Sequence, residues 1–522
     1  MMFFQQEEYK NKRFFKYIFR KLRLIDKKLS LVLLILLILC FFGIFDLKPE
    51  RCLVVLSILF AIFALLQPKT SKGKKPLVMT MRVKRILGVF YAIFLCTATS
   101  LFLYTAVRCE LHIQKLVLIL LILIQIIPFY IILANIMLFP LEKAIRNKYF
   151  KEAKQKIKKL NPIIIGITGS YGKTSVKHIL GHVLRSENEA LFTPGSVNTI
   201  MGVSRIIRER LKKEHKYFVV EMGAYKIGSI DYLCTLTPPQ YGIITAIGDA
   251  HYERFKSKET IAKAKFELAK NVFKNNKNGF VVINSEMVKT KFIDEHAKDN
   301  KKQIKLVSKK DNKKHETFVI SKDKETVNGL EFEIKIDKKS YKVKAPIYGD
   351  HQIQNISIAF AMAYSLGMKP SSIVSALKTL PQTTHRLEVK KQGSVTIIDN
   401  AYNSNFVGFT SALKTLNLLK KKNGRTILVT PGMVELGKLH DEQHFEIGKK
   451  VGESIDVVLL VAPDRIKTFI DGFSKTSKTN QKLIKFSSFQ EAREWLNLNM
   501  QSNDVVLFEN DLPDLFESKV SI

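Results

Sequence analysis

Residues 162–175 read Pro-Ile-Ile-Ile-Gly-Ile-Thr-Gly-Ser-Tyr-Gly-Lys-Thr-Ser, and a helical pattern follows them to Leu184. The β-branched run 162–167 predicts a short buried strand, and the glycines after it predict a tight turn. Strand, glycine turn, Gly-Lys-Thr and helix form the layout of a phosphate-binding loop, because backbone N–H groups at a helix N-terminus bind phosphate. The strict pattern has glycine where Ile167 stands, and the nearest glycine is Gly166. A chance Gly-Lys-Thr in a turn is the alternative, which the flanking strand and helix disfavour.

The loop residues divide into those that wrap phosphate and those that carry charge or bind metal. In such loops the lysine, here Lys173, reaches the β- and γ-phosphates, and the next hydroxyl, here Thr174, binds Mg²⁺. The chain has no LSGGQ-type signature and no Asn-Lys-x-Asp motif in a plausible place, so ABC-type ATPases and GTPases are excluded. The residues expected to bind the nucleotide here are Gly169, Ser170, Gly172, Lys173, Thr174 and Ser175.

Composition divides the chain into an apolar and a charged part. The chain has 522 residues and a net charge of +37, and its mean hydropathy of +0.02 is high for a protein that is 25% charged. Nearly all long apolar runs lie in the first 140 residues. A purely soluble protein, a disordered chain and a disulfide scaffold are therefore excluded. The lysines are spread along the chain without a nucleic-acid-binding signature, so we expect no nucleic-acid partner.

Four apolar runs predict a membrane segment, at residues 29–45, 52–67, 86–107 and 116–140. About 20 helical residues cross a bilayer, so the last two runs are long enough, and the first two form either short spans or a re-entrant pair. Before, between and after the runs the Lys+Arg counts are 9, 2, 7, 2 and 8. This alternation predicts a multi-pass anchor in the inner (cytoplasmic) membrane, with the lipid bilayer as a partner and the catalytic domains in the cytoplasm.

We predict an α/β fold in four parts: transmembrane helices at residues 1–140, a basic juxtamembrane helix near anionic headgroups at 141–160, a phosphate-loop ATPase domain at 161–383 and a Rossmann-like ligase domain at 384–522. Strands of the third part are expected at 162–167, 217–221, 241–246 and 279–283, with a small antiparallel insertion at 315–347. Those of the fourth part are expected at 394–399, 426–430, 456–461, 483–486 and 504–508, in the alternation with helices that is typical of parallel sheets.

Further motifs follow the phosphate loop in a fixed order. They are Thr193-Pro-Gly-Ser-Val-Asn198-Thr-Ile-Met-Gly202, Glu221-Met-Gly223-Ala224, Ile247–His251 with Ala262-Lys263-Ala264-Lys265, Gly349-Asp-His351-Gln-Ile-Gln-Asn355, His385-Arg386-Leu-Glu388, Asp399-Asn-Ala-Tyr402-Asn403-Ser-Asn405 and Met433-Val-Glu435-Leu-Gly437. Over roughly residues 160–510 this set resembles the Mur ligases, ATP-dependent amide-forming enzymes of peptidoglycan synthesis. The Asp-x-x-Tyr-Asn-x-Asn and Glu-Leu-Gly segments are most similar to the MurF type, which joins D-alanyl-D-alanine (D-Ala-D-Ala) to UDP-MurNAc-tripeptide.

The resemblance implies an acyl phosphate made from ATP and a carboxylate, with Mg²⁺ bound, and then attack by an amine. It implies roles for four groups of residues. Catalysis is assigned to Lys173, His251 and Lys265, the last as a carbamate, and metal binding is assigned to Thr174, Glu221, His251 and Lys265. Further nucleotide contacts are assigned to Asn355, Arg386 and Asp399. Substrate contacts are assigned to Asn198, Tyr402, Asn403 and Glu435.

Several positions depart from the family's pattern. Asn400 replaces an Asp, Phe406 replaces a Pro, and Pro431-Gly432 precedes Met433 where Gly-Asp is usual. The membrane segment stands where a MurF enzyme carries its UDP-sugar domain. Two alternatives therefore remain beside the MurF-like reading: a ligase that acts on a lipid-linked or polymer carboxylate, and a nucleotide-binding membrane scaffold with little activity.

Overall fold

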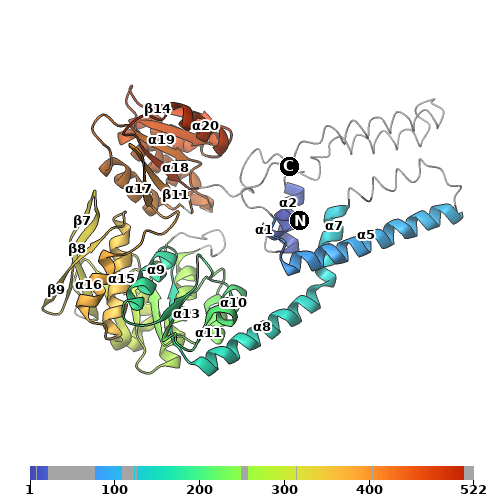
Figure 1. Ribbon diagram of the computed structural model, residues 1–522, viewed down its shortest axis with the longest axis horizontal. Helices are drawn as coiled ribbons and strands as arrows, with labels where there is room; N and C mark the ends of the chain where they lie inside the picture. Colours follow the sequence, from blue (N-terminus) through green and yellow to red (C-terminus); the bar gives the residue numbers. More distant parts are fainter. Residues whose placement is uncertain are drawn as a thin grey trace. The chain divides into compact units, whose positions relative to one another are not determined.

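The computed structural model describes residues 1–6, 9–20, 77–108, 123, 126–248, 255, 257–312, 314–402, 404–434 and 436–510. The chain forms two units, one built from the N-terminal residues up to Asn147 and one from Lys148 onward (Figure 1).

The described part of the first unit is helical. Helix α5 (Met81–Arg108) covers the third predicted apolar run, and its residues 81–104 are long and apolar enough to cross a membrane. Helices α7 (Ile127–Met137) and α8 (Phe139–Leu160) are long and apolar enough only when they are taken together. The two helices are bent by 49° relative to each other, so the pair would be a broken span or a re-entrant loop. Two short helices, α1 (Met2–Gln6) and α2 (Asn11–Arg20), precede them.

The prediction of a multi-pass anchor is therefore only partly met by the described residues. They contain one candidate span, or two if the bent pair is counted as one. The predicted runs 29–45 and 52–67 lie outside the described residues, as does most of 116–125. The described end of the fourth run is interrupted: α7 ends at Met137, and α8 begins at Phe139 with Pro140 in its first turn, where a proline is well accommodated.

The second unit opens with a nine-stranded sheet in the order β2-β3-β1-β4-β5-β6-β7-β8-β9. Neighbours from β2 to β7 pair in parallel, and β7, β8 and β9 pair antiparallel. The strands are β1 (Ile163–Thr168), β2 (Ala190–Phe192), β3 (Tyr217–Glu221), β4 (Tyr241–Ile244), β5 (Val281–Asn284), β6 (Ile304–Ser308), β7 (Glu316–Thr326), β8 (Gly329–Ile336) and β9 (Lys339–Ala345).

Helices cover both faces of this sheet because successive strand residues point to opposite sides. Ile165 and Val219 belong to the core shared with α9 (Lys173–Arg185), α15 (His351–Ser365) and α16 (Pro370–Lys378). Ile164 and Val220 belong to the core on the other face. That face is covered by α10 (Ile200–Arg210), α11 (Ser229–Leu236), α13 (Lys258–Asn275), α14 (Thr290–Ala297) and the C-terminal half of α8.

The second sheet of this unit has six strands in the order β10-β11-β15-β12-β13-β14, and only β10 runs antiparallel. Its strands are β10 (Glu388–Gln392), β11 (Val395–Asn400), β12 (Thr426–Thr430), β13 (Val457–Val461), β14 (Lys482–Phe486) and β15 (Val505–Glu509). Helices α17 (Phe406–Leu418), α18 (His440–Ser454) and α19 (Lys467–Thr476) pack on one face, and α20 (Phe489–Asn499) packs on the other (Figure 1).

The α/β fold class is confirmed, and each predicted strand is present with its ends shifted by at most a few residues. Three strands were not predicted: β2, β6 and β10. The antiparallel pairing predicted at 315–347 is confirmed in β7, β8 and β9. Strand β7 pairs in parallel with β6, so the segment extends the central sheet.

Candidate functional site

The phosphate loop connects β1 to α9 and can be built only with glycine at two positions. Gly169 has φ +152°, and a Cβ there would lie 1.9 Å from Thr245 Oγ1. Gly172 is the left-handed N-cap of α9 with φ +77°, and a Cβ there would lie 2.6 Å from Asn355 Oδ1. Neither position has room for a side chain. The glycines therefore leave the backbone N–H groups at the N-terminus of α9 open to a phosphate group.

Glu221, at the end of β3, joins the phosphate loop to the predicted substrate loop. Its Oε2 accepts a hydrogen bond from Thr174 Oγ1 at 2.9 Å and from Lys177 Nζ at 3.0 Å. Its Oε1 accepts one from Asn198 Nδ2 at 3.0 Å. Lys177 also donates to the carbonyl of Gly195. The structure thus brings together three residues predicted from the sequence and adds Lys177, which was not predicted.

The charges around Glu221 keep it ionised although it is only 1% exposed. Burial alone would raise the pKa of its carboxyl group. The nearby charges of Lys177 and Lys173 and the hydrogen bond from Asn198 outweigh burial, so the pKa is lowered. A buried carboxylate beside a threonine hydroxyl offers the hard oxygen ligands that Mg²⁺ prefers.

Lys173 lies folded back on its own loop. Its Nζ donates to the carbonyl of Gly169 at 2.7 Å. Burial lowers the pKa of its ammonium, and the charges of Arg386 and Lys177 lower it further while Glu221 opposes them. This cation is therefore placed next to the backbone groups that would bind phosphate.

Lys265, to which the resemblance assigns a metal-binding carbamate, and its neighbour Lys263 have opposite environments on α13. Lys265 is 3% exposed, whereas Lys263 is exposed. Burial lowers the pKa of Lys265 well below its usual value, and the charge of Lys173 lowers it further. Within the described part of the chain no hydrogen bond or ion pair reaches the Lys265 ammonium. A neutral amine in this place has the nucleophilicity that carbamate formation requires.

A small cavity of about 90 Å³ adjoins the phosphate loop at Tyr171, Gly172 and Ser175. Asn355, predicted to contact the nucleotide, lines it and donates to Gln352 Oε1 at 2.8 Å. His351 lines it too, and burial lowers the pKa of this imidazole to about 4. His351 Nδ1 is buried without a hydrogen-bond partner in the described structure, so this wall offers a free polar atom to a bound group.

Arg386 enters the site from the hinge segment before β10. Its guanidinium lies over the ring of Tyr402 at 4.4 Å, and it lines both cavities. Its neighbours His385 and Leu387 have φ +59° and +54°, a backbone conformation that costs energy in residues other than glycine. Side chains of the next strand hold this strained segment, which fixes the direction of Arg386.

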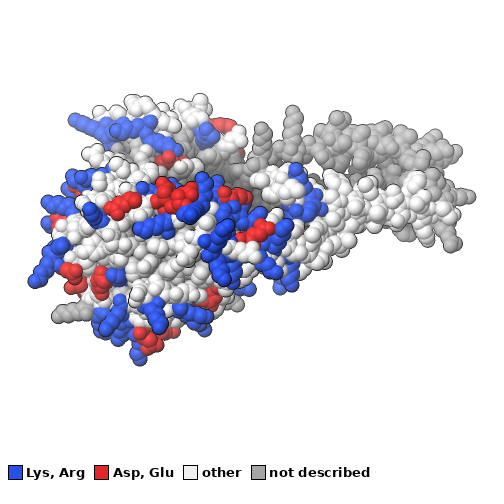
Figure 2. Space-filling view, turned by 60° about the horizontal axis from the view of Figure 1, so that its bottom comes forward, with Lys and Arg blue, Asp and Glu red and all other residues white. Residues whose placement is uncertain are grey.

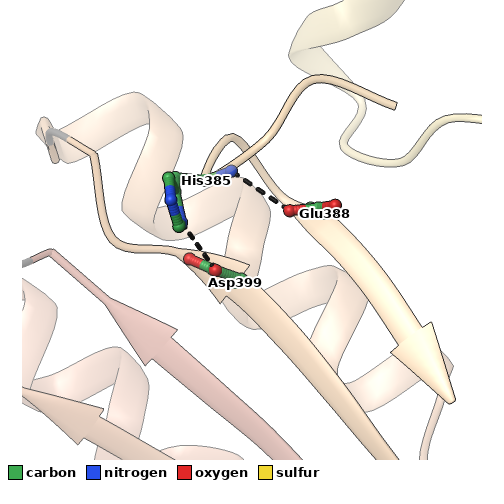
Figure 3. A group of neighbouring side chains, drawn as sticks. All are labelled: His385, Glu388 and Asp399. Carbon is green, nitrogen blue, oxygen red and sulfur yellow. Dashed lines mark hydrogen bonds and ion pairs between the residues drawn. The ribbon is translucent and has the colours of Figure 1, made fainter. Parts of the chain in front are cut away.

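Asp399 is one of those side chains. Its Oδ2 lies 2.7 Å from His385 Nδ1, and Glu388 Oε2 accepts from the His385 amide at 3.3 Å (Figure 3). His385, Glu388 and Asp399 form a group whose ligand atoms lie within 4.8 Å of one another. Glu388 also pairs with Lys390 at 2.9 Å. These contacts give Asp399 a role in fixing the hinge in addition to the predicted nucleotide contact.

A buried carboxyl that the sequence did not point to completes this support. Asn400 Oδ1 accepts from the Leu387 amide at 3.0 Å, and Asn400 Nδ2 donates to Glu509 Oε2 at 2.8 Å. Glu509 is 0% exposed and also accepts from Ser404 Oγ at 2.5 Å. Burial raises the pKa of Glu509 to about 7, although both hydrogen bonds act to lower it.

The larger cavity, about 490 Å³, follows one face of α9 from the phosphate loop to the helix end. Thr174, His178, His182 and Arg185 recur at helical spacing along it, and the hinge forms another wall. Among the described residues that line it, Arg185 and Arg386 are charged and none is acidic. The cavity therefore suits an anion. Ser175 lines both cavities.

Three predicted site residues cannot be placed, because His251, Asn403 and Glu435 lie outside the described residues. Ser170 is placed in the loop by its Oγ, which accepts from the Gly248 amide at 3.0 Å. His444 is fully buried and accepts from the Met433 amide at 2.9 Å.

Comparison with protein families follows the same division. The Mur ligase middle domain matches residues 167–363, and the Mur ligase glutamate ligase domain matches residues 385–509. The chain belongs to the Mur ligase family.

Individual Mur ligases are similar over part of the chain. The UDP-N-acetylmuramoyl-tripeptide–D-alanyl-D-alanine ligase of Buchnera aphidicola is 32% identical over 298 residues, which cover 57% of this chain and 63% of that one. MurF from Acinetobacter baumannii has a TM-score of 0.61 at 25% identity, over 70% of this chain and 77% of that one. MurF from Thermotoga maritima, solved with ADP, shares the fold with a TM-score of 0.59 at 23% identity, over 72% and 82%. The chain spans less than two thirds of the length of the first curated relatives.

Proposed function

We propose that this Mur ligase joins a carboxylate to an amine at the expense of ATP, with UDP-MurNAc-tripeptide as the carboxylate substrate and D-Ala-D-Ala as the amine. The hydrogen-bonded set around Glu221 carries this proposal, because it links the phosphate loop to Asn198 in the loop assigned to the substrate. The named relatives act on these two substrates. In domain terms, residues 161–383 would bind ATP, and residues 384–522 would close over it.

ATP is the co-substrate that the site fits. The glycines of the loop and the N-terminus of α9 would bind the phosphates, with Lys173 near the γ-phosphate. Asn355 and His351 line the small cavity beside the loop, which suits the nucleoside part. Arg386 and Asp399 would contact the nucleotide from the second sheet.

Thr174 and Glu221 would hold Mg²⁺, with His251 and a carbamate on Lys265 for a second ion. The fit rests on the donor set, since both described ligands present hard oxygen atoms. When bound, Mg²⁺ neutralises phosphoryl charge. Oε2 of Glu221 already accepts two hydrogen bonds, whereas Oε1 accepts one, so Oε1 has a lone pair left for the ion.

The reaction needs two balanced steps. A carboxylate oxygen attacks the γ-phosphorus and releases ADP, which forms an acyl phosphate. The amine then attacks the acyl carbon, phosphate leaves, and the amine loses a proton. Negative charge grows on phosphoryl oxygens in both steps, so preplaced cations such as Lys173 and Arg386 supply most of the stabilisation.

The large cavity along α9 would hold the carboxylate substrate. It begins at Thr174, beside the phosphate loop, and extends to Arg185, about 16 Å away for eleven residues of helix. That length suits an extended acidic peptide whose terminal carboxylate lies at the loop. Asn198 and Tyr402, with Asn403 and Glu435, would contact this substrate near the reacting end.

Membrane attachment through α5 is a further part of the proposal. Only 11% of its apolar stretch is buried, so the described part of the protein leaves most of this apolar surface uncovered. This supports a second candidate, a lipid-linked carboxylate in place of the UDP-linked peptide. A scaffold without activity is disfavoured by the intact Lys173, Thr174 and Glu221 set.

ADP release by the detergent-solubilised chain tests the function. We expect release that requires both UDP-MurNAc-tripeptide and D-Ala-D-Ala and that is lost in Lys173→Ala. Release only with membrane lipid extract would favour the lipid-linked carboxylate. No release with any of them, from a chain that binds ATP, would contradict the proposal.

A further inference from the structure

Helix α8 carries a face that is rich in lysine. Six lysines fall within an arc of about 160° at 100° per residue, along about 24 Å of helix. All are exposed, and in the described structure none of them makes an ion pair or a hydrogen bond. They are Lys143, Lys148, Lys151, Lys154, Lys158 and Lys159.

The opposite face of the same helix packs against the domain of the central sheet. Ala153 and Ile157 are buried in the core under the central sheet. Phe150 stacks on Tyr232 with ring centroids 5.9 Å apart, and Glu152 pairs with Arg208 at 2.7 Å. Because these contacts fix the rotation of the helix, the lysine face points away from the domain.

Positive charge alone does not distinguish this face, since Lys and Arg occur all over the surface shown in Figure 2. On that surface, however, acidic side chains stand among the basic ones (Figure 2). The lysine face of α8 has none: its two acids, Glu142 and Glu152, lie off the arc and are paired with arginines. Like charges so close together are stabilised by an external anionic surface.

The start of α8 is joined to the start of the apolar helix α5. Glu142 is 6% exposed, and its Oε1 lies 2.6 Å from Arg85 Nη2. Its Oε2 lies 3.9 Å from Arg82 Nε. Phe139 and Leu141, in the first turn of α8, are 59% and 47% exposed. The lysine face therefore begins where apolar side chains begin, at the level that a headgroup layer occupies if α5 spans the bilayer.

We propose that the lysine face of α8 binds the anionic headgroups of the membrane and so holds the ligase domains at the bilayer surface. This rests on the proposed membrane attachment of α5 and goes beyond it, because α5 alone would anchor the chain in any lipid. The partner is a surface of anionic phospholipid. An acidic protein would not explain why apolar side chains adjoin the lysines.

Lysine accessibility in the full chain tests this. The protein is placed in nanodiscs of phosphatidylcholine alone or with about one third phosphatidylglycerol, and acetylation of each lysine is measured by mass spectrometry. We expect the six lysines to react at least about threefold more slowly in the anionic discs at low salt, and to recover at high salt. Lys475, Lys478 and Lys485, in the second sheet's domain, serve as internal controls and should not change.

The outcomes separate the two proposals. A chain that enters both kinds of disc and reacts equally in them would overturn the role of α8 and leave the role of α5 intact. A chain that stays outside the discs would overturn both. A variant in which glutamine replaces the six lysines is compared in the same two kinds of disc by hydrogen exchange of the α8 amides. If the anionic discs still slow this exchange in the variant, the inference is contradicted.

Discussion

The ammonium nitrogen of Lys177 lies 3.0 Å from Oε2 of Glu221, in an ion pair whose two side chains are 0% and 1% exposed. This pair stands where the phosphate loop meets the loop that holds Asn198. Burial lowers the pKa of Lys177, and the charge and hydrogen bond of Glu221 oppose that effect. Lys177 therefore does two things: it keeps Glu221 ionised, and it fixes the carbonyl of Gly195.

Replacing Lys177 by methionine should destabilise the central domain by about 3–5 kcal/mol, because it leaves a buried carboxylate without its partner. Ligase turnover should fall by about a hundredfold or more, since the orientation of Glu221 is lost. Thermal unfolding and ADP release measure the two effects. Lys213→Met, at an exposed position, is the control and should change neither. Full activity of Lys177→Met would contradict the role given to the pair.

Lys265 should take up carbon dioxide and Lys263 should not. Burial lowers the pKa of the Lys265 ammonium well below its usual value, which favours the free amine that reacts with carbon dioxide, whereas Lys263 is exposed. We expect a carbamate signal in the ¹³C NMR spectrum of the chain in ¹³C-bicarbonate. The signal should vanish in Lys265→Arg and remain in Lys263→Arg. A signal that persists in Lys265→Arg would disprove the assignment.

Glu509 should make the second sheet's domain lose stability as the pH rises. Its pKa is about 7 in the folded protein and near 4.5 when unfolded, so the native state holds the proton more tightly. The stability that this proton gives is complete below pH 4.5 and is lost as the pH rises through 7. A shift of this size corresponds to about 3 kcal/mol. Trp495, the only tryptophan, lies in this domain and reports its unfolding by urea.

Glu509→Gln resembles the protonated acid and supplies the matched comparison. The amide can donate to Ser404 while its oxygen accepts from Asn400, so the domain should be more stable than the native chain at pH 8 and similar at pH 4.5. The domain's stability should then be nearly independent of pH between those values. Identical pH profiles for the two proteins would show that Glu509 is not the titrating group.

Arg185 should act on substrate binding and not on chemistry. It lies at the far end of the large cavity, about 16 Å along α9 from Thr174, and its guanidinium stacks 4.5 Å from the Phe192 ring. Arg185→Gln should raise the KM for the carboxylate substrate about tenfold, leave the KM for ATP unchanged and leave kcat nearly unchanged. Arg185→Lys keeps the charge and should lose less. If Arg185→Gln and Arg185→Lys instead lowered kcat equally, Arg185 would not act through substrate binding, and the substrate would lie elsewhere.

The sequence was sufficient for the parts of the site that follow from local pattern. The phosphate loop is encoded in one short segment, and Glu221 ends the strand next to it, so parallel pairing brings the two together. Lys177 could not be found in this way. It is one of 84 basic residues, and only its position opposite Glu221, 44 residues later, makes it special.

Long-range pairing also explains the other omissions. Glu509 reads as the last residue of a strand, and it becomes a buried acid only because β15 lies beside β11 and places it against Asn400. Strand β10 was missed because it is largely exposed and lacks an apolar pattern. In the first unit, α5 covers the third predicted apolar run, and the break between α7 and α8 at Leu138 lies close to the boundary predicted between the fourth run and the basic helix at residue 141.

Oxygen transfer from the carboxylate to phosphate tests the central claim most directly. UDP-MurNAc-tripeptide labelled with ¹⁸O in its terminal carboxylate is incubated with the full chain, ATP and D-Ala-D-Ala, and the released phosphate is analysed by mass spectrometry. The account predicts one ¹⁸O in each phosphate formed and a product that contains the dipeptide. Phosphate without ¹⁸O, released at the same rate with and without the peptide, would show simple ATP hydrolysis and would contradict an acyl-phosphate ligase.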